Sequence, residues 1–313
     1  MRLDRFGGPE VLRVVDVDRP SPAEGEALVR VVAAGVNPVD WKVRATGGGG
    51  RFGTPPLVLG WDLSGVVEVV ADGVSAFAAG DEVFGMPRFP DPAGCYAEYV
   101  AAPADQLAAK PSALDHAAAA GLPLAGLTAL QVLDLAEVEA GQRVLVHAAA
   151  GGVGHLAVQL AKARGAEVVG TARADKHPFL VELGIDQAVD YTTAAFEEVV
   201  DGVDVVLDPV GGDYARRSLE VLRPGGVLLM IAGRADEALT AAAGSAGVRI
   251  VRHLVHPDGP GLARLADLAE RGALQVAVER AFPLDQAAKA HELGERGRTR
   301  GKLVLSVARP IGP

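Results

Sequence analysis

The feature that most constrains the fold is an apolar run that breaks into small residues and glycines and then resumes with helical spacing. It reads Val144-Leu-Val-His-Ala-Ala-Ala-Gly151-Gly-Val-Gly154-His-Leu-Ala-Val-Gln-Leu. Short runs of valine and leucine favour a strand, and apolar residues three or four apart favour a helix. The stretch therefore predicts a strand, a tight turn and a helix, the unit that holds the pyrophosphate of a dinucleotide.

The residue that distinguishes NAD from NADP is expected about twenty residues beyond this turn. The segment there reads Glu167-Val-Val-Gly-Thr-Ala-Arg173, so no carboxylate closes the strand and an arginine follows it. A carboxylate would accept from the ribose hydroxyl of NAD, whereas an arginine suits the additional phosphate of NADP. The sequence therefore predicts binding of NADP(H).

Length and composition narrow the remaining possibilities. A chain of 313 residues predicts about two domains, and its net charge of −10 without a basic cluster argues against nucleic-acid and anionic-membrane partners. Cys95 is the only cysteine, which excludes an internal disulfide and is typical of a reducing cytoplasm. The N-terminus lacks the apolar core of a signal peptide, and the apolar stretch Ala117–Leu133 predicts a buried helix rather than a membrane span.

Two rhythms divide the chain. The first hundred residues predict many short strands separated by glycine, proline and aspartate, as in a small barrel or sandwich, with a flexible loop at Gly47–Gly50. From about Ala117 strands and helices alternate, which predicts a doubly wound parallel sheet. After Asp258 two helices and a final strand at Lys302–Val307 are expected to return to the first domain. The strands of the parallel sheet are expected at residues 144–147, 168–171, 189–191, 203–208, 226–231 and 248–251.

Seven ordered segments carry a family resemblance. They are Arg5-Phe-Gly-Gly-Pro-Glu-Val-Leu, Ala34-Gly-Val-Asn-Pro-Val-Asp40, Leu59-Gly-Trp-Asp-Leu-Ser-Gly-Val-Val, Gly80-Asp-Glu-Val-Phe-Gly, Gly126-Leu-Thr-Ala, Asp208-Pro-Val-Gly-Gly and Gly301-Lys-Leu-Val-Leu. With the glycine-rich turn, they make the chain resemble the zinc-free quinone oxidoreductase (zeta-crystallin-like) branch of the medium-chain dehydrogenase/reductase superfamily. The resemblance implies an α/β protein with a GroES-like β-barrel domain (1–116 and 258–313), a Rossmann NADP(H)-binding domain (117–257) and an active cleft between them. Because Met1 comes early relative to the family, the first strand is expected to be short.

The resemblance also implies where the cofactor binds. Gly151 would let the backbone approach the pyrophosphate, and Gly154 would let the helix pack on the sheet. Arg173, Lys176 and Tyr191 would contact the 2′-phosphate, although a surface loop would also carry such charges. Thr128 would face the nicotinamide, although a threonine that bonds back to its own helix reads the same way. The full set of expected cofactor residues is Thr128, Ala150, Gly151, Gly152, Val153, Gly154, Arg173, Lys176, Tyr191, Ala232, Gly233, Leu254 and Val255.

No metal site is expected. Where zinc-dependent relatives carry a cysteine and a histidine, this chain has Asn37 and Trp61, and neither side chain replaces a thiolate or an imidazole at tetrahedral zinc. The four-cysteine structural lobe of those relatives is also missing.

Three polar residues are the expected catalytic group. In the family, Asn37, Asp40 and Lys42 lie near the nicotinamide, and quinones and α,β-unsaturated carbonyls are electrophilic enough to accept hydride without a metal. Asn37 would donate to the developing oxyanion or hold the ribose, Lys42 would add positive charge, and Asp40 would orient Lys42 or the ribose. Alternatively, the segment is a polar turn in which asparagine precedes proline and aspartate caps a helix.

The predicted function is therefore NADPH-dependent reduction of a small quinone or enone. An enoyl-thioester reductase and a non-catalytic NADPH-binding sensor or structural protein remain alternatives, and a zinc alcohol dehydrogenase is the most distant one. A homodimer formed through the sheet edge at Val248–Val251 is also possible from the sequence.

Overall fold

The computed structural model describes residues 1–307 and divides the chain into two compact units. Unit 1 contains Met1–Leu127 and the chain from His256 onward, and unit 2 contains Thr128–Val255. The first boundary falls eleven residues later than the sequence suggested. The reason is that helix α2 (His116–Gly121) packs on strands of unit 1 rather than on the parallel sheet.

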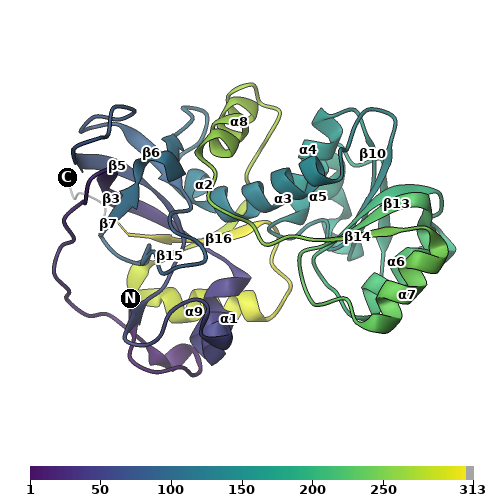
Figure 1. Ribbon diagram of the computed structural model, residues 1–313, viewed down its shortest axis with the longest axis horizontal. Coiled ribbons are helices and arrows are strands. Elements are labelled where there is room, and N and C mark those ends of the chain that lie inside the picture. Colours follow the sequence, from purple (N-terminus) through teal and green to yellow (C-terminus); the bar gives the residue numbers. More distant parts are fainter. Residues whose placement is uncertain (308–313) are drawn as a thin grey trace. The chain divides into compact units, whose positions relative to one another are not determined.

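Unit 2 is built on a parallel sheet of six strands in the order β11-β10-β9-β12-β13-β14. Strands β10, β13 and β14 of this sheet are labelled in Figure 1. Chain order therefore reverses between β9 and β12, which is the point where open α/β sheets bind ligands, beyond the carboxyl ends of the strands. The doubly wound sheet is confirmed. Its strands are β9 (Arg143–Val146), β10 (Glu167–Ala172), β11 (Gln187–Asp190), β12 (Val203–Asp208), β13 (Leu222–Met230) and β14 (Arg249–Arg252).

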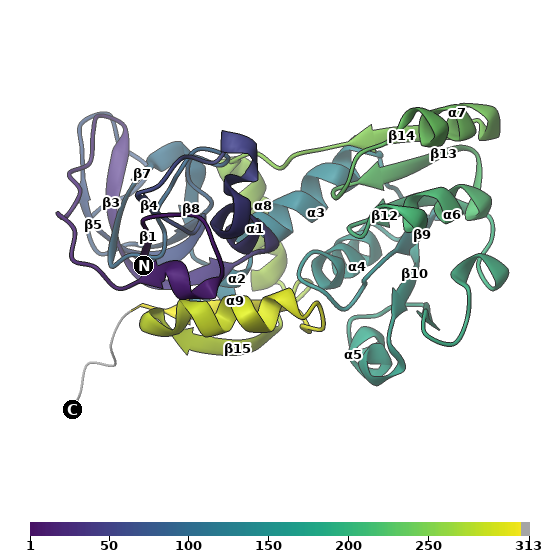
Figure 2. The ribbon, with the colours of Figure 1, turned by 90° about the horizontal axis from the view of Figure 1, so that it is seen from below.

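Helices cover both faces of this sheet. Right-handed crossovers that leave the centre in opposite directions place their helices on opposite faces, as Figure 2 shows for α4 and α6. The sequence did not predict α7, because its alanines and glycine give little apolar periodicity; Asp236 caps it by accepting from the N–H of Leu239 at 2.7 Å. The helices are α4 (Gly154–Ala163), α5 (His177–Glu182), α6 (Asp213–Val221) and α7 (Glu237–Ala246).

The predicted single helix over Ala117–Leu133 is two helices. Helix α2 ends at Gly121, and α3 (Pro123–Leu135) begins two residues later. Pro123 has no N–H to continue the hydrogen-bond ladder of α2, so it opens a new helix instead. The sequence signal was the proline itself, which the apolar character of its neighbours outweighed.

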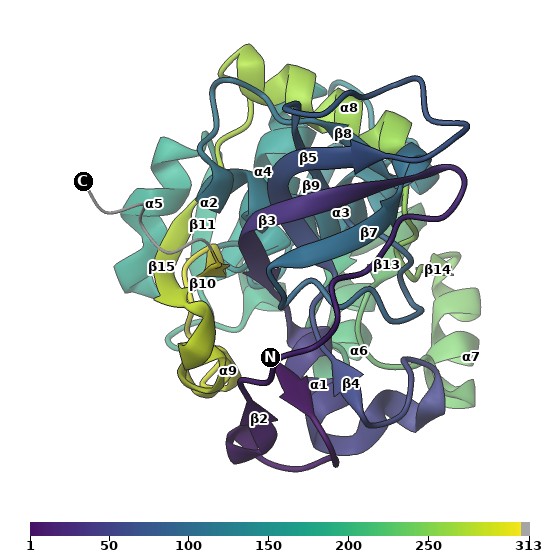
Figure 3. The ribbon, with the colours of Figure 1, turned by 90° about the vertical axis from the view of Figure 1, so that its left-hand side faces the viewer.

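Unit 1 is the GroES-like unit, and its main sheet has seven strands. Strand β3 pairs with both β5 and β7 (Figure 3), and the last strand, β16, pairs antiparallel with β3, so the predicted return of the chain is confirmed. A second, three-stranded sheet has the order β2-β1-β4, and β1 is only two residues long. The strands are β1 (Arg2–Leu3), β2 (Leu12–Arg13), β3 (Glu26–Val36), β4 (Leu57–Val58), β5 (Asp62–Val70), β6 (Glu82–Gly85), β7 (Tyr99–Pro103), β8 (Leu107–Ala109), β15 (Val278–Pro283) and β16 (Lys302–Ser306).

Three helices complete unit 1: α1 (Pro38–Thr46), α8 (Gly259–Glu270) and α9 (Ala287–Glu295), with α1 packed against α9. The expected loop at Gly47–Gly50 is a short 3₁₀ turn in which all four glycines have positive φ. Among residues 1–307, no helix combines the length and the apolar character needed to cross a membrane.

Candidate functional site

Asn37 lies at the junction between the longest strand of unit 1 and helix α1. Strand β3 ends at Val36, and Pro38 occupies the first position of the helix, where its missing N–H is not needed. The backbone N–H of Asn37 donates to Oδ2 of Asp40 at 2.6 Å, a carboxylate capping contact at the positive end of the helix. Both side chains are buried, so the local polar turn faces the interior of the unit.

The side-chain amide of Asn37 is held between two opposite charges. Its Nδ2 donates to Oδ2 of Asp62 at 2.7 Å, and the ammonium of Lys302 donates to its Oδ1. Strand pairing explains this meeting: Asp62 opens β5 opposite Gly35, and Lys302 opens β16 directly before the Leu303–Val36 pair. A Cβ at Gly35 would lie 2.8 Å from the Asp62 carboxylate, so only glycine leaves room for that side chain.

Asp62 and Lys302 form a fully buried ion pair. The ammonium lies 3.8 Å from Oδ2 of Asp62, whose other oxygen accepts from the N–H of Leu124 at 2.8 Å, in the first turn of α3. Burial raises the pKa of Asp62 and lowers the pKa of Lys302, while each charge counters the shift of the other. Removing either partner would leave an uncompensated buried charge.

A second chain of hydrogen bonds ends on Asp40. Arginine carries only donors, so its 3.2 Å contact with Nδ1 of His291 makes Nδ1 the acceptor and leaves the proton on Nε2. Nε2 therefore donates to Tyr96 Oη at 3.2 Å, and that hydroxyl donates to Oδ2 of Asp40 at 3.0 Å. The same arginine, Arg44, pairs with Glu295 at 2.6 Å. The donors from Nη1 of Arg44, Nε2 of His291 and Oη of Tyr96 thus follow one another towards the carboxylate of Asp40.

The carboxyl group of Asp40 is only half satisfied. Oδ2 has two donors, whereas Oδ1 is buried and has no hydrogen-bond partner among residues 1–307. Burial raises the pKa of Asp40 to about 7. Burial and the charge of Arg44 lower the pKa of His291 to about 3, so this ring is neutral at physiological pH. The network can therefore hold a proton at Asp40 near neutral pH.

The structure does not bring Lys42 into this network. Asp40 and Lys42 are two residues apart on α1, and they point in different directions: the carboxylate is buried, and the lysine is exposed. The expected contact between them is absent, and Asp40 is partnered by Asn37 and Tyr96 instead.

Trp61 occupies an aromatic cluster with Phe52 and Phe89, with ring centroids 5.7 to 5.8 Å apart. Its indole N–H donates to the carbonyl of Asp91 at 2.8 Å, so this side chain packs and has no free polar group. Within residues 1–307, no group of three or more histidine, cysteine, aspartate or glutamate side chains is placed to hold a metal ion.

In unit 2, the glycine-rich turn connects β9 to α4. Ala148 adopts a positive φ of 47°, and Gly151 N–H donates back to its carbonyl at 2.9 Å. A Cβ at Gly154 would lie 2.3 Å from that same carbonyl oxygen, so the helix approaches the strand more closely than any side chain allows. The N–H groups of Gly152, Val153 and Gly154 find no backbone acceptor among residues 1–307. Free N–H groups at a helix N-terminus suit the pyrophosphate of NADP(H).

A buried histidine, His147, lies directly before this turn and makes hydrogen bonds to two neighbouring elements. Nδ1 of His147 lies 3.1 Å from the hydroxyl of Thr171, and Nε2 lies 3.0 Å from the hydroxyl of Ser218. Burial lowers the pKa of His147 to about 3, so the ring is neutral and acts as a fixed hydrogen-bonding bridge between neighbouring elements. The sequence analysis missed it, although a polar residue that closes an apolar strand was a usable signal.

The three residues predicted to contact the 2′-phosphate of NADP(H) lie at one corner of the sheet. In the parallel pair β10–β11, Ala172 lies opposite Asp190, so Arg173 and Tyr191 leave the sheet side by side. Arg173 is exposed, Tyr191 is 42% exposed, and the ammonium of Lys176 lies 3.7 Å from the carboxylate of Asp175. An exposed arginine, a half-buried lysine and a phenol therefore lie at or just beyond the carboxyl ends of adjacent strands.

The other expected cofactor residues divide into two groups. Ala232 and Gly233 follow β13, and Leu254 and Val255 follow β14, so all four lie beyond the carboxyl ends of strands, as the glycine-rich turn does. Thr128 is instead buried within α3. The strand topology, and not proximity in sequence, brings the first group to one edge.

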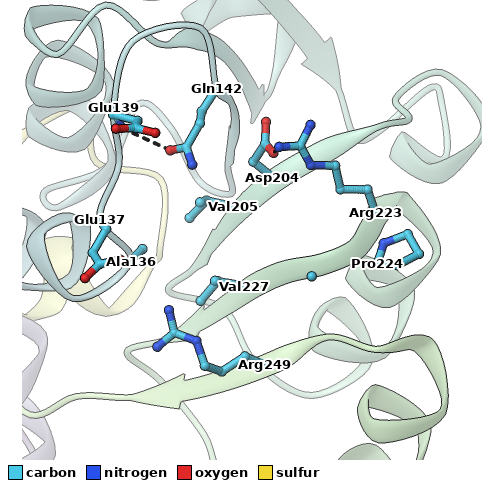
Figure 4. Close-up of a pocket in the computed structure, with 11 residues that line it drawn as sticks. Ala136, Glu137, Glu139, Gln142, Asp204, Val205, Arg223, Pro224, Val227 and Arg249 are labelled. Carbon is cyan, nitrogen blue, oxygen red and sulfur yellow. Dashed lines mark hydrogen bonds and ion pairs between the residues drawn. The ribbon is translucent and has the colours of Figure 1, made fainter.

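Unit 2 also has a polar pocket of about 390 Å³ at the opposite edge of the sheet (Figure 4). Glu139, Asp204, Arg223 and Arg249 contribute charges of both signs, and Asp204 is ion-paired with Arg223. It lies at the amino ends of the strands, whereas cofactors of such sheets bind at the carboxyl ends. We therefore do not assign the nucleotide to it.

Comparisons with known proteins agree with this picture. The "Alcohol dehydrogenase GroES-like domain" family model matches residues 23–112, and the "Zinc-binding dehydrogenase" model matches residues 183–305. The chain is 36% identical to the NADPH-dependent alkenal/one oxidoreductase of Arabidopsis thaliana, over 96% of this chain and 77% of that protein.

Two solved structures are similar over nearly the whole chain. The quinone oxidoreductase of Coxiella burnetii is 39% identical with a TM-score of 0.92, covering 98% of both chains. The Escherichia coli quinone oxidoreductase, solved in complex with NADPH, is 30% identical with a TM-score of 0.87, covering 98% of this chain and 99% of that one.

Proposed function

The chain belongs to the zinc-free quinone oxidoreductase branch of the medium-chain dehydrogenase/reductase superfamily, and on that basis we propose that it is an NADPH-dependent reductase of quinones or α,β-unsaturated carbonyl compounds. The observation that carries the proposal is the turn at Gly151–Gly154. Its N–H groups, which have no backbone acceptor within the described part of the chain, lie at the strand-order reversal of the parallel sheet, where a dinucleotide pyrophosphate binds.

The preference for NADPH is supported by the corner of the sheet formed by Arg173, Lys176 and Tyr191. No carboxylate closes β10, so the acceptor that would favour the ribose of NAD is missing there. The Escherichia coli relative was solved with NADPH, and the Arabidopsis relative is named for it.

NADPH, when bound, supplies the hydride. In an enone this hydride adds to the β-carbon, and negative charge develops on the carbonyl oxygen of the resulting enolate. A proton then adds to the α-carbon. The protein must stabilise the negative charge until that proton arrives. Asn37 offers an amide N–H for this role, and Asp40 holds a proton near neutral pH. We propose that the reaction needs no zinc, because Asn37 and Trp61 occupy the positions of two ligands.

The decisive experiment measures oxidation of NADPH, at its absorbance near 340 nm, against a panel of ortho-quinones, para-quinones, 2-alkenals and enoyl thioesters, with NADH in parallel. We expect turnover with quinones or alkenals, a preference for NADPH, and no change on treatment with a chelator. Turnover of enoyl thioesters alone would replace the proposed substrate class. Tight NADPH binding without any turnover would indicate a sensor or structural protein, and metal-dependent activity would refute the zinc-free mechanism.

We also propose a homodimer formed through β14, which is an edge strand of the sheet within the described residues, and a cytoplasmic location. The unpaired backbone edge of β14 can continue the sheet into a second copy. Size-exclusion chromatography with light scattering tests the dimer, and a monomer at micromolar concentration would refute it. Cell fractionation tests the location.

A further inference from the structure

Asn37 is the only asparagine among the 313 residues of the chain. It is 1% exposed, and it lies where β3, β5, α1 and β16 of unit 1 converge. Its side-chain amide has one acceptor oxygen and two N–H donors. The hydrogen-bond partners decide which position Oδ1 occupies and which position Nδ2 occupies. The partners here leave one orientation.

The partner on one side has only donors. The ammonium of Lys302 cannot accept a hydrogen bond, so the amide atom that it contacts must be the oxygen. On the other side the ionised carboxylate of Asp62 can only accept, so the atom 2.7 Å from it must be the nitrogen. Reversing the amide would set a nitrogen donor against an ammonium and an oxygen against a carboxylate, and both contacts would be repulsive.

We propose that Lys302 and Asp62 are positioning residues that fix the amide of Asn37 as a hydrogen-bond donor towards the substrate. One N–H of Nδ2 donates to Asp62, and the second N–H remains to donate to a substrate. The ammonium on Oδ1 withdraws electron density from the amide, which strengthens the remaining N–H as a donor and weakens the oxygen as an acceptor. A fixed donor stabilises a developing oxyanion, so the arrangement favours carbonyl acceptors over alcohol substrates.

The surrounding backbone holds both charges in place. Asp62 is anchored through its second oxygen by the N–H of Leu124, and the backbone N–H of Lys302 donates to the carbonyl of Ala277 at 2.8 Å. A Cβ at Gly301 would lie 2.2 Å from that carbonyl oxygen, so glycine is required directly before the lysine. The pair is therefore built into the strand framework.

The kinetic test, which rests on the proposed function, compares Lys302→Met with Lys110→Met. Lys110 is a matched control because its ammonium is also buried in unit 1, where it pairs with Glu82 at 3.2 Å and contacts no residue of the Asn37 network. We expect Lys302→Met to lower kcat at least tenfold, with the acceptor KM and the NADPH Kd within threefold of wild type. Lys110→Met should change kcat by no more than twofold, and Lys302→Arg should recover most of the lost kcat.

Equal losses of kcat in the two methionine variants would overturn the proposal, as would a raised KM at unchanged kcat in Lys302→Met. If Lys302→Met does not fold, the double variant Lys302→Gln with Asp62→Asn removes both charges together and so avoids an unpaired buried ion. A purely structural pair predicts wild-type kcat in this double variant, whereas a positioning pair predicts at least a tenfold loss.

A second readout does not depend on turnover. Because the chain has one asparagine, protein labelled with ¹⁵N at asparagine side chains gives a single NH₂ pair in its NMR spectrum. We expect this pair to move or broaden in Lys302→Met and to stay in place in Lys110→Met. An unchanged pair in Lys302→Met would overturn the proposed orientation. If wild type binds NADPH but reduces no acceptor, the proposed function fails. This NMR experiment still tests whether Lys302 and Asp62 fix the orientation of the Asn37 amide.

Discussion

Acidification should weaken unit 1 through His291. This ring is buried between Arg44 and Tyr96, and its pKa of about 3 is far below the ordinary 6.5 because of burial and the charge of Arg44. The unfolded chain therefore binds a proton below pH 6.5, whereas the folded chain stays neutral until about pH 3. The stabilisation is complete above pH 6.5 and is lost as the pH falls. At pH 5.0 the loss is about 2 kcal/mol, at about 1.4 kcal/mol for each pH unit below the unfolded pKa.

The measurement is urea unfolding at pH 7.5 and pH 5.0, followed by tryptophan fluorescence. Both tryptophans, Trp41 and Trp61, belong to unit 1, so the signal reports this unit alone. His291→Gln removes the titrating ring, and we expect its change in unfolding free energy between the two pH values to differ from that of wild type by about 2 kcal/mol. The control is His256→Gln, an exposed histidine of the same unit, which should behave like wild type.

Asp40 acts in the opposite direction. Its pKa is raised to about 7 by burial, so it contributes stability that is complete below about pH 4 and lost as the pH rises through 7. Wild type and His291→Gln both contain Asp40, and the comparison between them removes its contribution. If the two proteins show the same pH dependence, the His291 ring titrates normally in the folded state. The hydrogen-bond chain from Arg44 to Asp40 would then be wrong.

Three further outcomes are expected. Gly154→Ala should raise the NADPH Kd at least tenfold, because the new methyl group would lie 2.3 Å from a backbone oxygen; Gly244→Ala, a helical position with nothing within 4 Å, should leave the Kd unchanged. Arg173→Asp should raise the ratio of the Kd for NADPH to that for NADH, measured by cofactor titration, and an unchanged ratio would exclude this arginine from the phosphate site. Asn37→Ala should lower kcat by about 10²-fold in steady-state assays without abolishing it, since the loss of one oxyanion donor is of that order; complete loss in a folded, NADPH-binding variant would contradict the assigned role.

The alternating half of the fold could be predicted because its signals are local. Most strands of unit 2 contain short apolar runs, and most breaks between elements contain glycine or proline, so the strand predictions fall within a few residues of β9 to β14. Helix α7 escaped because alanine and glycine give no contrast between its two faces. The break at Pro123 escaped because the helices on both sides are buried, so apolar character continued across it.

The candidate site divides in the same way. The glycine-rich turn was predictable because its constraint lies within a few residues, whereas Asn37 was expected in the site only from the family resemblance. Tyr96, His291 and Lys302 were not predictable, because their partners are distant in sequence: Tyr96 meets Asp40 across 56 residues, His291 meets Tyr96 across 195, and Lys302 meets Asn37 across 265. A sequence pattern specifies that a face is buried, but it does not specify which distant strand will cover it.

One general signal did remain unused. Lysine is rarely fully buried without a partner, yet Lys302 opens an apolar strand that continues Leu-Val-Leu, and Asp62 likewise opens a strand after Leu59-Gly-Trp. A buried charge at either position needs an opposite charge nearby, and Lys302 and Asp62 can pair with each other. The demand follows from the sequence, whereas the geometry, with the amide of Asn37 placed between the two charges, follows only from the register of β16 on β3. That intermediate position is what turns a structural ion pair into a device that can orient a donor.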